Sequence, residues 1–127
     1  MKALVTSIIS LALVIGVWGV YFNYSTSMLN DMVKSCEDEI IPAMKSSDWS
    51  KAKDEIEHQY KTWHKYRKAA LYFLDTGYVN DTDTAFARAL EYIDEEDASN
   101  GRGEVLSLKE QLSALRDNEK ISFTNIF

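Results

Sequence analysis

The residues best suited to chemistry lie in one stretch, Ser47 to Tyr66, which reads SDWSKAKDEIEHQYKTWHKY. It holds both histidines of the chain, two of its three tryptophans and four carboxylates, a set that could bind a metal ion or serve as an acid and base pair. His58 and His64, however, are six positions apart, about 240° around a helix, whereas histidines that share a zinc ion on one helix stand four apart. We therefore predict no metal site, no cofactor and no catalytic residue here.

The same stretch carries an apolar and aromatic stripe with the three- and four-residue spacing of a helix face. Its charged residues fall largely on the opposite side of the helical wheel. We expect a helix that begins after an N-cap at Ser46 or Ser47 and turns its tryptophans inward against neighbouring helices. The stripe consists of Trp49, Ala52, Ile56, Tyr60, Trp63, Ala70 and Leu74.

Three further segments show helical spacing of their apolar residues: residues 29–44, residues 79–93 and residues 105–115. The connections between them are short, so segments that follow one another in sequence are expected to pack side by side in alternating directions. The sequence therefore predicts an all-α fold, with an antiparallel bundle of three or four helices after the N-terminal segment.

Helix breaks are expected at three places. Pro42 interrupts or kinks the first segment, because proline lacks the amide hydrogen. Residues 74–83 form a turn, and Gly101 or Gly103 caps the end of the following helix. The single cysteine, Cys36, cannot form an internal disulfide and is expected to be a small buried residue.

Acidic residues gather in residues 91–97, at a helix end where the helix dipole disfavours negative charge. An antiparallel neighbour would bring Lys51 and Lys53 alongside these acids. The same arrangement would bring a set of basic residues toward Asp81 and Asp83: Lys61, Lys65, Arg67 and Lys68. Two interpretations follow for residues 91–97: the acids bind a cation or a basic partner, or they form ion pairs with these lysines between helices.

The N-terminal segment is apolar over twenty residues, Ala3 to Phe22, with no charged side chain. At about 1.5 Å per residue it would span roughly 30 Å, the thickness of the hydrocarbon layer of a bilayer. Trp18 and Tyr24 stand near one end, where aromatic rings prefer the membrane interface. The sequence predicts a signal anchor at residues 1–22, embedded in the lipid bilayer, and a helical domain at residues 23–127.

A cleaved signal peptide is the alternative for this segment. Its apolar core would be longer than the usual 7–15 residues, and no A-x-A cleavage site follows it. Lys2 favours a cytoplasmic amino terminus, which predicts a single-pass protein of the cell membrane with its C-terminal domain outside the cytoplasm. The net charge of −6 argues against nucleic acid as a partner, since phosphate binding requires a basic surface.

Three classes of function fit this architecture. The first, which we favour, is a non-enzymatic interaction module that binds another membrane or envelope protein. The second is an extracytoplasmic ligand-binding or sensing bundle that acts through a membrane partner and holds a small molecule near Trp49, Trp63 and Tyr66. An enzyme is least favoured, because the sequence shows no nucleophile with a base, metal cluster or phosphate loop.

The last seven residues, ISFTNIF, are largely apolar. They either pack back on the bundle or form a docking peptide for a partner, through Asn125, Ile126 and Phe127. We favour packing, because burying three or four such side chains stabilises a fold by several kcal/mol.

Several short motifs resemble those of DUF4363, an uncharacterised family of small membrane-anchored proteins from clostridia and bacilli. They are the SDWSKA helix start, the pattern W-x6-A-x2-F-x-D from Trp63 to Asp75, ARALEYI at residues 87–93, LKEQL at residues 108–112 and the closing NIF. The resemblance implies a Gram-positive cell envelope and an integral-membrane partner, and it implies no reaction. Members of the family tend to carry a histidine where this chain has Asp75, which weakens any site built on that position.

Overall fold

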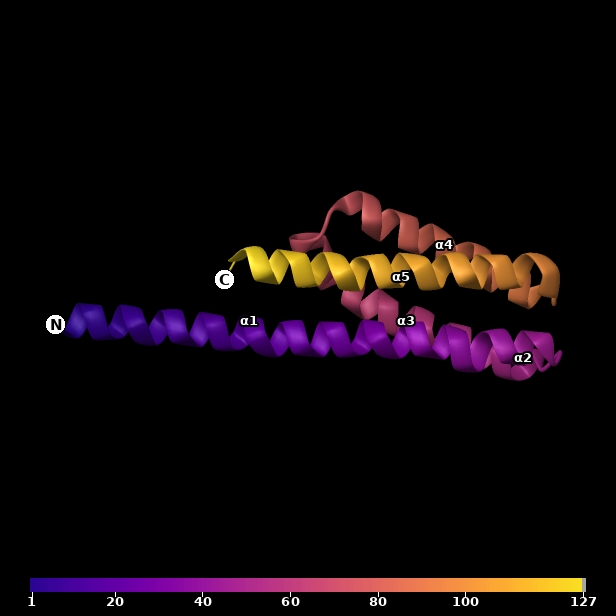
Figure 1. Ribbon diagram of the computed structural model, residues 1–127, viewed down its shortest axis with the longest axis horizontal. Helices are drawn as coiled ribbons and strands as arrows, with labels where there is room; N and C mark the ends of the chain where they lie inside the picture. The colour runs from indigo at the N-terminus through magenta and orange to yellow at the C-terminus, as the bar shows by residue number, and fades with distance from the viewer. Residues whose placement is uncertain (127) are drawn as a thin grey trace.

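The computed structural model describes residues 1–126, with side chains described for all of them except residue 73 and residues 120–126. Every regular element in this range is helical, so the predicted all-α fold is confirmed. Four long helical stretches lie side by side and alternate in direction, and the first projects well beyond the other three (Figure 1). The fold is therefore an antiparallel four-helix bundle with a projecting N-terminal helix.

The first helical stretch begins at Lys2 and ends at Lys45 without a break, over 44 residues. It consists of α1 (Lys2–Ser35), a wider π-helical turn, η1 (Cys36–Ile40), and α2 (Ile41–Lys45). Pro42 stands in the first turn of α2, directly after the π-helical turn. Because proline cannot donate the usual backbone hydrogen bond, the wider turn before it lets the helix continue past this residue. Pro42 thus changes the helix locally and does not end it.

The N-terminal half of α1 is uncovered. Its most apolar 18-residue window has a mean hydropathy of 2.3, and none of that window is buried against the rest of the chain. Among the residues that the structure describes, this is the one helix long and apolar enough to cross a membrane. The segment is therefore not part of the core of this bundle.

The other three long helices are α3 (Trp49–Phe73), α4 (Thr76–Asp94) and α5 (Ala98–Ile126). Each begins directly after an aspartate whose side chain accepts a backbone hydrogen bond from the first turn. The donors are the amide of Lys51 to Asp48 (3.3 Å), of Gly77 to Asp75 (2.7 Å) and of Asn100 to Asp97 (3.1 Å). Such caps satisfy amides that have no partner within the helix.

Two of the predicted helix boundaries are wrong. The N-cap of α3 is Asp48 rather than Ser46 or Ser47, and Ser47 instead takes a left-handed conformation with φ of 60° in the preceding turn. The turn expected at residues 74–83 is much shorter, because α4 already begins at Thr76 after the Asp75 cap.

The predicted glycine cap at Gly101 or Gly103 is also wrong, since both residues lie inside α5. The left-handed residue between α4 and α5 is Glu96, with φ of 57°. Gly101 has a different role: a Cβ atom built on it would stand 2.6 Å from Cε of Met44. The missing side chain thus allows the start of α5 to pack closely on α2.

The apolar stripes predicted from the sequence form the core. Trp63, which is fully buried, stacks against Phe86 with 6.0 Å between ring centroids, and Cys36 is buried as predicted. The largest fully buried side chains come from every long helix: Leu29, Ile40, Met44, Ile56, Trp63, Val79, Phe86, Ile93, Val105, Leu108, Leu112 and Leu115. Of the two tryptophans in residues 47–66, Trp63 therefore faces inward, as predicted.

Two of the predicted ion pairs between helices are present. Arg67 Nε lies 2.7 Å from Asp83 Oδ2, and Lys53 Nζ lies 3.6 Å from Glu96 Oε1. Lys51 pairs with Glu39 instead, at 2.8 Å. The ion pairs thus connect α3 both to α4 and to the end of the first helical stretch.

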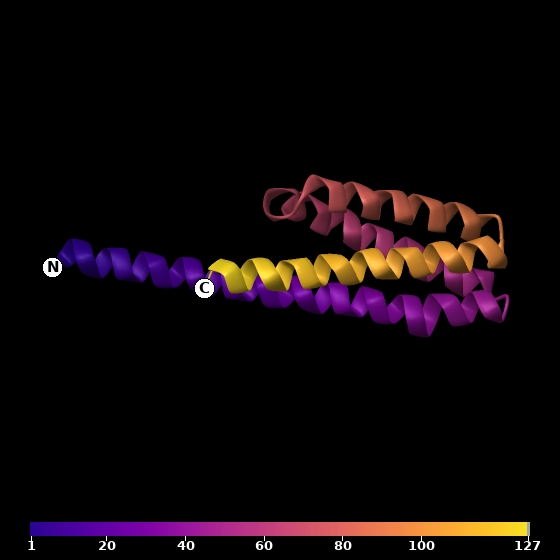
Figure 2. The same ribbon diagram turned by 45° about the horizontal axis from the view of Figure 1, so that its top comes forward.

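The four helices do not pack equally. α5 lies along both α1 and α4, and α3 lies along α4 (Figure 2). α3 packs on the first helical stretch mainly through η1 and α2 and only weakly through α1, so the seam between α1 and α3 is loosely packed.

Candidate functional site

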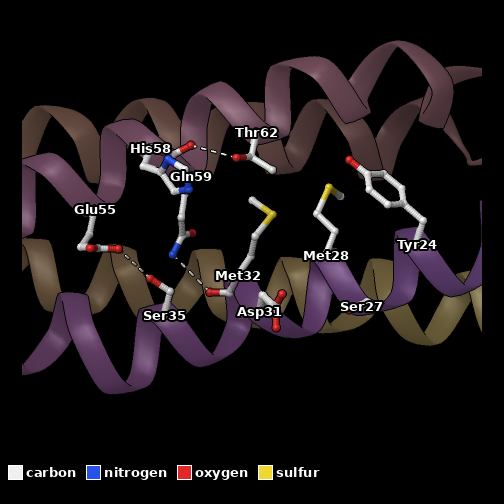
Figure 3. Close-up of a pocket in the computed structure, with 10 residues that line it drawn as sticks. All are labelled: Tyr24, Ser27, Met28, Asp31, Met32, Ser35, Glu55, His58, Gln59 and Thr62. Carbon is white, nitrogen blue, oxygen red and sulfur yellow. Dashed lines mark hydrogen bonds between the residues drawn. The ribbon is translucent and has the colours of Figure 1, made fainter.

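A groove of about 480 Å³ runs along the open seam between α1 and α3 (Figure 3). Six residues of α1 and four of α3 line it: Tyr24, Ser27, Met28, Asp31, Met32, Ser35, Glu55, His58, Gln59 and Thr62. Met28 and Met32 extend from α1 toward α3, and Gln59 extends from α3 in the opposite direction. Methionine side chains are flexible and polarisable, so this floor can adapt to the shape of an apolar group.

Direct hydrogen bonds connect α1 to α3 in the part of the groove far from the apolar segment. Gln59 Nε2 donates to the carbonyl oxygen of Met32 (3.2 Å), and Ser35 Oγ donates to Glu55 Oε2 (3.4 Å). The thiol of Cys36 lies 3.7 Å from Gln59 Oε1, and burial raises the pKa of that thiol to about 11. Toward Tyr24, which is 66% exposed, the groove opens at the end of the bundle nearest the apolar segment.

The rim of the groove is acidic. Of the ten described residues that line it, Asp31 and Glu55 are carboxylates and none is a lysine or arginine. Asp38 and Glu39 extend the acidic rim around Lys34 beyond Ser35. The groove therefore combines a methionine floor with a negative edge, which suits a cationic, partly apolar group better than an anionic one.

A buried carboxylate forms a second cluster, near the apolar segment. Glu119 of α5 is 7% exposed and accepts hydrogen bonds from Ser25 Oγ to both carboxylate oxygens (2.6 Å each) and from Tyr66 Oη to Oε1 (2.8 Å). Burial raises the pKa of Glu119, although the hydrogen bonds from Ser25 and Tyr66 act in the opposite direction. Burial also raises the pKa of Tyr66, and the neighbouring Glu119 adds to that shift. The cluster joins three helices around one carboxylate.

Sequence reasoning identified one residue of this cluster, Tyr66, and missed the other two. A signal was present, because Ser25 stands four positions before Leu29 and Glu119 four positions after Leu115. Both polar residues therefore continue an apolar stripe into a position that faces the core. The groove was missed for a different reason: the spacing of apolar residues along one helix, such as the stripe that includes Met32, does not show how closely α1 and α3 pack.

The residues predicted as partner or ligand contacts are spread over the molecule. Trp63 and Tyr66 lie together in the packed core, with 5.7 Å between ring centroids, and Trp63 Nε1 donates to Asp83 Oδ1 at 2.7 Å. Trp49 is partly buried at the other end of α3. The side chains of Asn125 and Ile126, and all of Phe127, lie outside the described residues.

No group of three or more histidine, cysteine, aspartate or glutamate side chains is placed to hold a metal ion in the described part of the chain. His58 lies on the wall of the groove, while the ring of His64 contacts Tyr60, with 5.4 Å between centroids. The two histidines are thus in different surroundings.

These features define a class of protein: an antiparallel helical bundle whose first helix continues into an uncovered apolar segment. The model of the family described as domain of unknown function, DUF4363, matches residues 19–126. The chain therefore belongs to this family, and the matched region contains both the groove and the Glu119 cluster. Comparisons with curated proteins and with solved structures found no match.

Proposed function

We propose that this protein is a single-pass, membrane-anchored helical module that binds another membrane or envelope protein through the groove between α1 and α3. The observation that carries the proposal is the place of the groove. α1 forms one wall of it, from Tyr24 to Ser35, and the uncovered apolar segment of the same helix ends directly before Tyr24. A groove held next to an anchor suits a partner that is itself held at the membrane.

The apolar segment supports the anchoring part of the proposal. Val17 and Val20 are 70% and 72% exposed, and the side chains around them are also apolar. Leaving so much apolar surface in water is unfavourable by about 25 cal/mol for each Å². The segment is long enough to span the hydrocarbon layer, and Lys2 favours an amino terminus in the cytoplasm and a bundle outside it.

The chemistry of the groove supports a basic, amphipathic partner segment. Its apolar side would pack over Met28 and Met32, which are 9% and 4% exposed, and its lysine or arginine side chains would face Asp31 and Glu55. From Tyr24 to Ser35 the wall is twelve residues long, about 16 Å of helix, which is the length of three helical turns. A helix of the partner would thus lie along the seam between α1 and α3.

Site-specific photocrosslinking in native membranes tests this function. A photoreactive amino acid at His58 or Thr62, on the groove wall, is expected to give one and the same crosslinked membrane protein. The matched control is Ala87, an exposed residue of α4, which should not give that product. The double substitution Asp31→Lys and Glu55→Lys should abolish the crosslink while the helical content remains.

Two results would overturn the proposal: recovery of the monomer alone at both groove positions, or a crosslink that survives both charge reversals. The anchoring part has its own test. Full-length protein should remain in the membrane after alkaline carbonate washing, and a C-terminal tag should be cleaved by protease added outside intact cells.

A second candidate function is the binding of a small cationic ligand. The groove volume of about 480 Å³ favours it, because pockets for small molecules commonly have volumes of about 300–1,000 Å³. In this case the ligand would occupy the groove rather than the space around Trp63 and Tyr66, which the packed core fills. Protection of a groove-lining reporter by a small molecule in the absence of other proteins would favour this function over the first.

A further inference from the structure

Exposed aromatic side chains gather at the end of the bundle nearest the apolar segment. Among the described side chains beyond residue 20, five large hydrophobic ones are exposed. Four of them lie at this end: Tyr24 (66% exposed), Leu71 (39%), Tyr72 (87%) and Tyr78 (41%). The fifth, Leu106, lies near the start of α5, toward the opposite end. We call the four residues the tyrosine belt.

The Glu119 cluster shows how far this end reaches along α1. Ser25 and Tyr66 bind the same carboxylate, so they stand at nearly the same level of two antiparallel helices. From Tyr66, α3 continues six residues to Tyr72, about 9 Å, which corresponds to the step from Ser25 back to Gly19 on α1. Tyr72 is therefore level with the last turn of the apolar segment.

The start of α4 and the end of α5 lie at the same end of the bundle (Figures 1 and 2). α4 begins at Thr76 directly after the turn that follows α3, so Tyr78 stands in its first turn. α5 continues seven residues beyond Glu119 to Ile126, about 10 Å. Both views of the fold show the α3–α4 turn and the C-terminal end of α5 at the end of the bundle from which the apolar segment projects (Figures 1 and 2).

We propose that the tyrosine belt is a second membrane contact, which rests in the headgroup layer and holds the bundle against the bilayer surface. The inference rests on the proposed anchoring of α1, since the anchor sets the level of the belt. Tyrosine rings favour this layer because their ring meets apolar chains while their hydroxyl stays hydrated. A leucine beside them adds apolar area that only a partly apolar layer can cover favourably.

The charges at this end set the depth of contact. Asp75, in the turn itself, is exposed, and Lys68 stands one helical turn before Tyr72. A charge is costly within hydrocarbon but tolerated among headgroups, and a lysine can extend its amine toward water. With one carboxylate and one amine near the belt, the contact should depend on the aromatic rings and not on the charge of the lipid.

A depth measurement on the full-length protein tests the inference. Single cysteines are placed in a Cys36→Ala background at Val14 in the apolar segment, at Thr76 in the α3–α4 turn, or at Glu95 at the opposite end of α4. Each is labelled with an environment-sensitive fluorophore, and the protein is reconstituted in phosphatidylcholine vesicles. Because the headgroup layer excludes water-soluble ions, iodide should quench the Thr76 probe at least about threefold less than the Glu95 probe. Adding anionic lipid should not change the ratio when the neutral quencher acrylamide replaces iodide, which a negative surface repels.

The matched variant carries Tyr72→Ser and Tyr78→Ser together with the Thr76 probe. Both tyrosines are exposed, so the bundle should stay folded, which circular dichroism checks, while iodide quenching at Thr76 rises toward the value at Glu95. The inference is overturned if the Thr76 probe is as accessible as the Glu95 probe, or if removing the tyrosines leaves its accessibility unchanged. A Val14 probe open to iodide would instead overturn the anchoring on which the inference rests.

Discussion

Ser25 and Glu119 are 94 positions apart in the sequence, and the hydroxyl of Ser25 lies 2.6 Å from each oxygen of the Glu119 carboxylate. The contact joins α1 to α5, directly beside the point where α1 leaves the bundle. Both side chains are buried, so their hydrogen bonds replace those that water would otherwise supply. The first prediction follows from this arrangement.

Glu119→Ala should destabilise the bundle by about 2–4 kcal/mol, because it opens a cavity and leaves the hydroxyls of Ser25 and Tyr66 without their acceptor. Glu119→Gln keeps the size of the side chain and a carbonyl acceptor for Tyr66. It should be at least as stable as the native protein at pH 8, because the raised pKa of Glu119 lowers the stability of the native bundle at high pH. Denaturant unfolding in detergent measures both changes, and equal losses for the two variants would contradict this account.

Glu119 should also make stability depend on pH. Its pKa is raised in the folded state, so the folded protein holds a proton that the unfolded chain has already released. The resulting contribution to stability is fully present below the ordinary glutamate pKa and is lost as pH rises through the raised folded pKa. The difference in unfolding free energy between the native protein and Glu119→Gln isolates this term from other carboxylates. A difference that does not change between pH 4 and pH 8 would show that the pKa of Glu119 is not raised.

Trp63→Ala should cost about 3–5 kcal/mol, because the ring is fully buried against Phe86 and Tyr66 and its Nε1 donates to Asp83. Trp49→Ala is the control, since Trp49 is only partly buried and should cost clearly less. Thermal unfolding followed by circular dichroism measures the two losses. Trp63→Ala with an unchanged melting temperature would mean that the ring does not hold the core together.

Gly101 and Gly103 should respond differently to substitution by alanine. Gly103 lies within α5 with open space around it, so Gly103→Ala should stabilise the helix by about 0.5–1 kcal/mol. At Gly101 the new Cβ would meet the terminal methyl of Met44 at 2.6 Å, and because this flexible but buried side chain must shift, Gly101→Ala should be less stable than Gly103→Ala by about 0.5–1 kcal/mol. Paired chemical denaturation curves test the order. The close packing of α5 on α2 would be disproved if Gly101→Ala were the more stable of the two.

Cys36 should react slowly with water-soluble thiol reagents. It is fully buried, and burial raises its pKa to about 11, so the reactive thiolate is scarce at neutral pH. Labelling should become rapid in denaturant, when the bundle opens. The control is a Ser46→Cys variant, whose exposed residue in the α2–α3 turn should react at once. Equal rates at the two positions in the folded protein would contradict the burial of Cys36.

Much of the fold could be predicted because helix faces are local features of a sequence. The stripe that includes Ile56 and Trp63 fixed which side of α3 is buried, and the ion pair between Arg67 and Asp83 followed from antiparallel neighbours. The helix boundaries were harder to predict, since aspartates cap α3 and α5 where serine and glycine residues nearby are also common at helix ends. Asp97 caps α5 only four residues before Gly101, which by itself looks like the end of a helix.

The candidate site could not be predicted in the same way. The groove depends on how far α1 and α3 stand apart, and the apolar stripes of the two helices do not encode that distance. The contact between Ser25 and Glu119 requires knowing that the first and last helices are neighbours. The level of Tyr72 relative to the apolar segment in turn depends on that contact.

The unbroken helix from Lys2 to Lys45 has a mechanical consequence. From Phe22 to Met44 it forms a lever of about 33 Å. A change of about 10° in the tilt of the apolar segment would therefore move Met44 sideways by about 6 Å. The same rotation would press the α3–α4 turn toward the lipid or lift it away. Bilayer thickness, through its effect on tilt, would thereby set the height at which the bundle presents its groove.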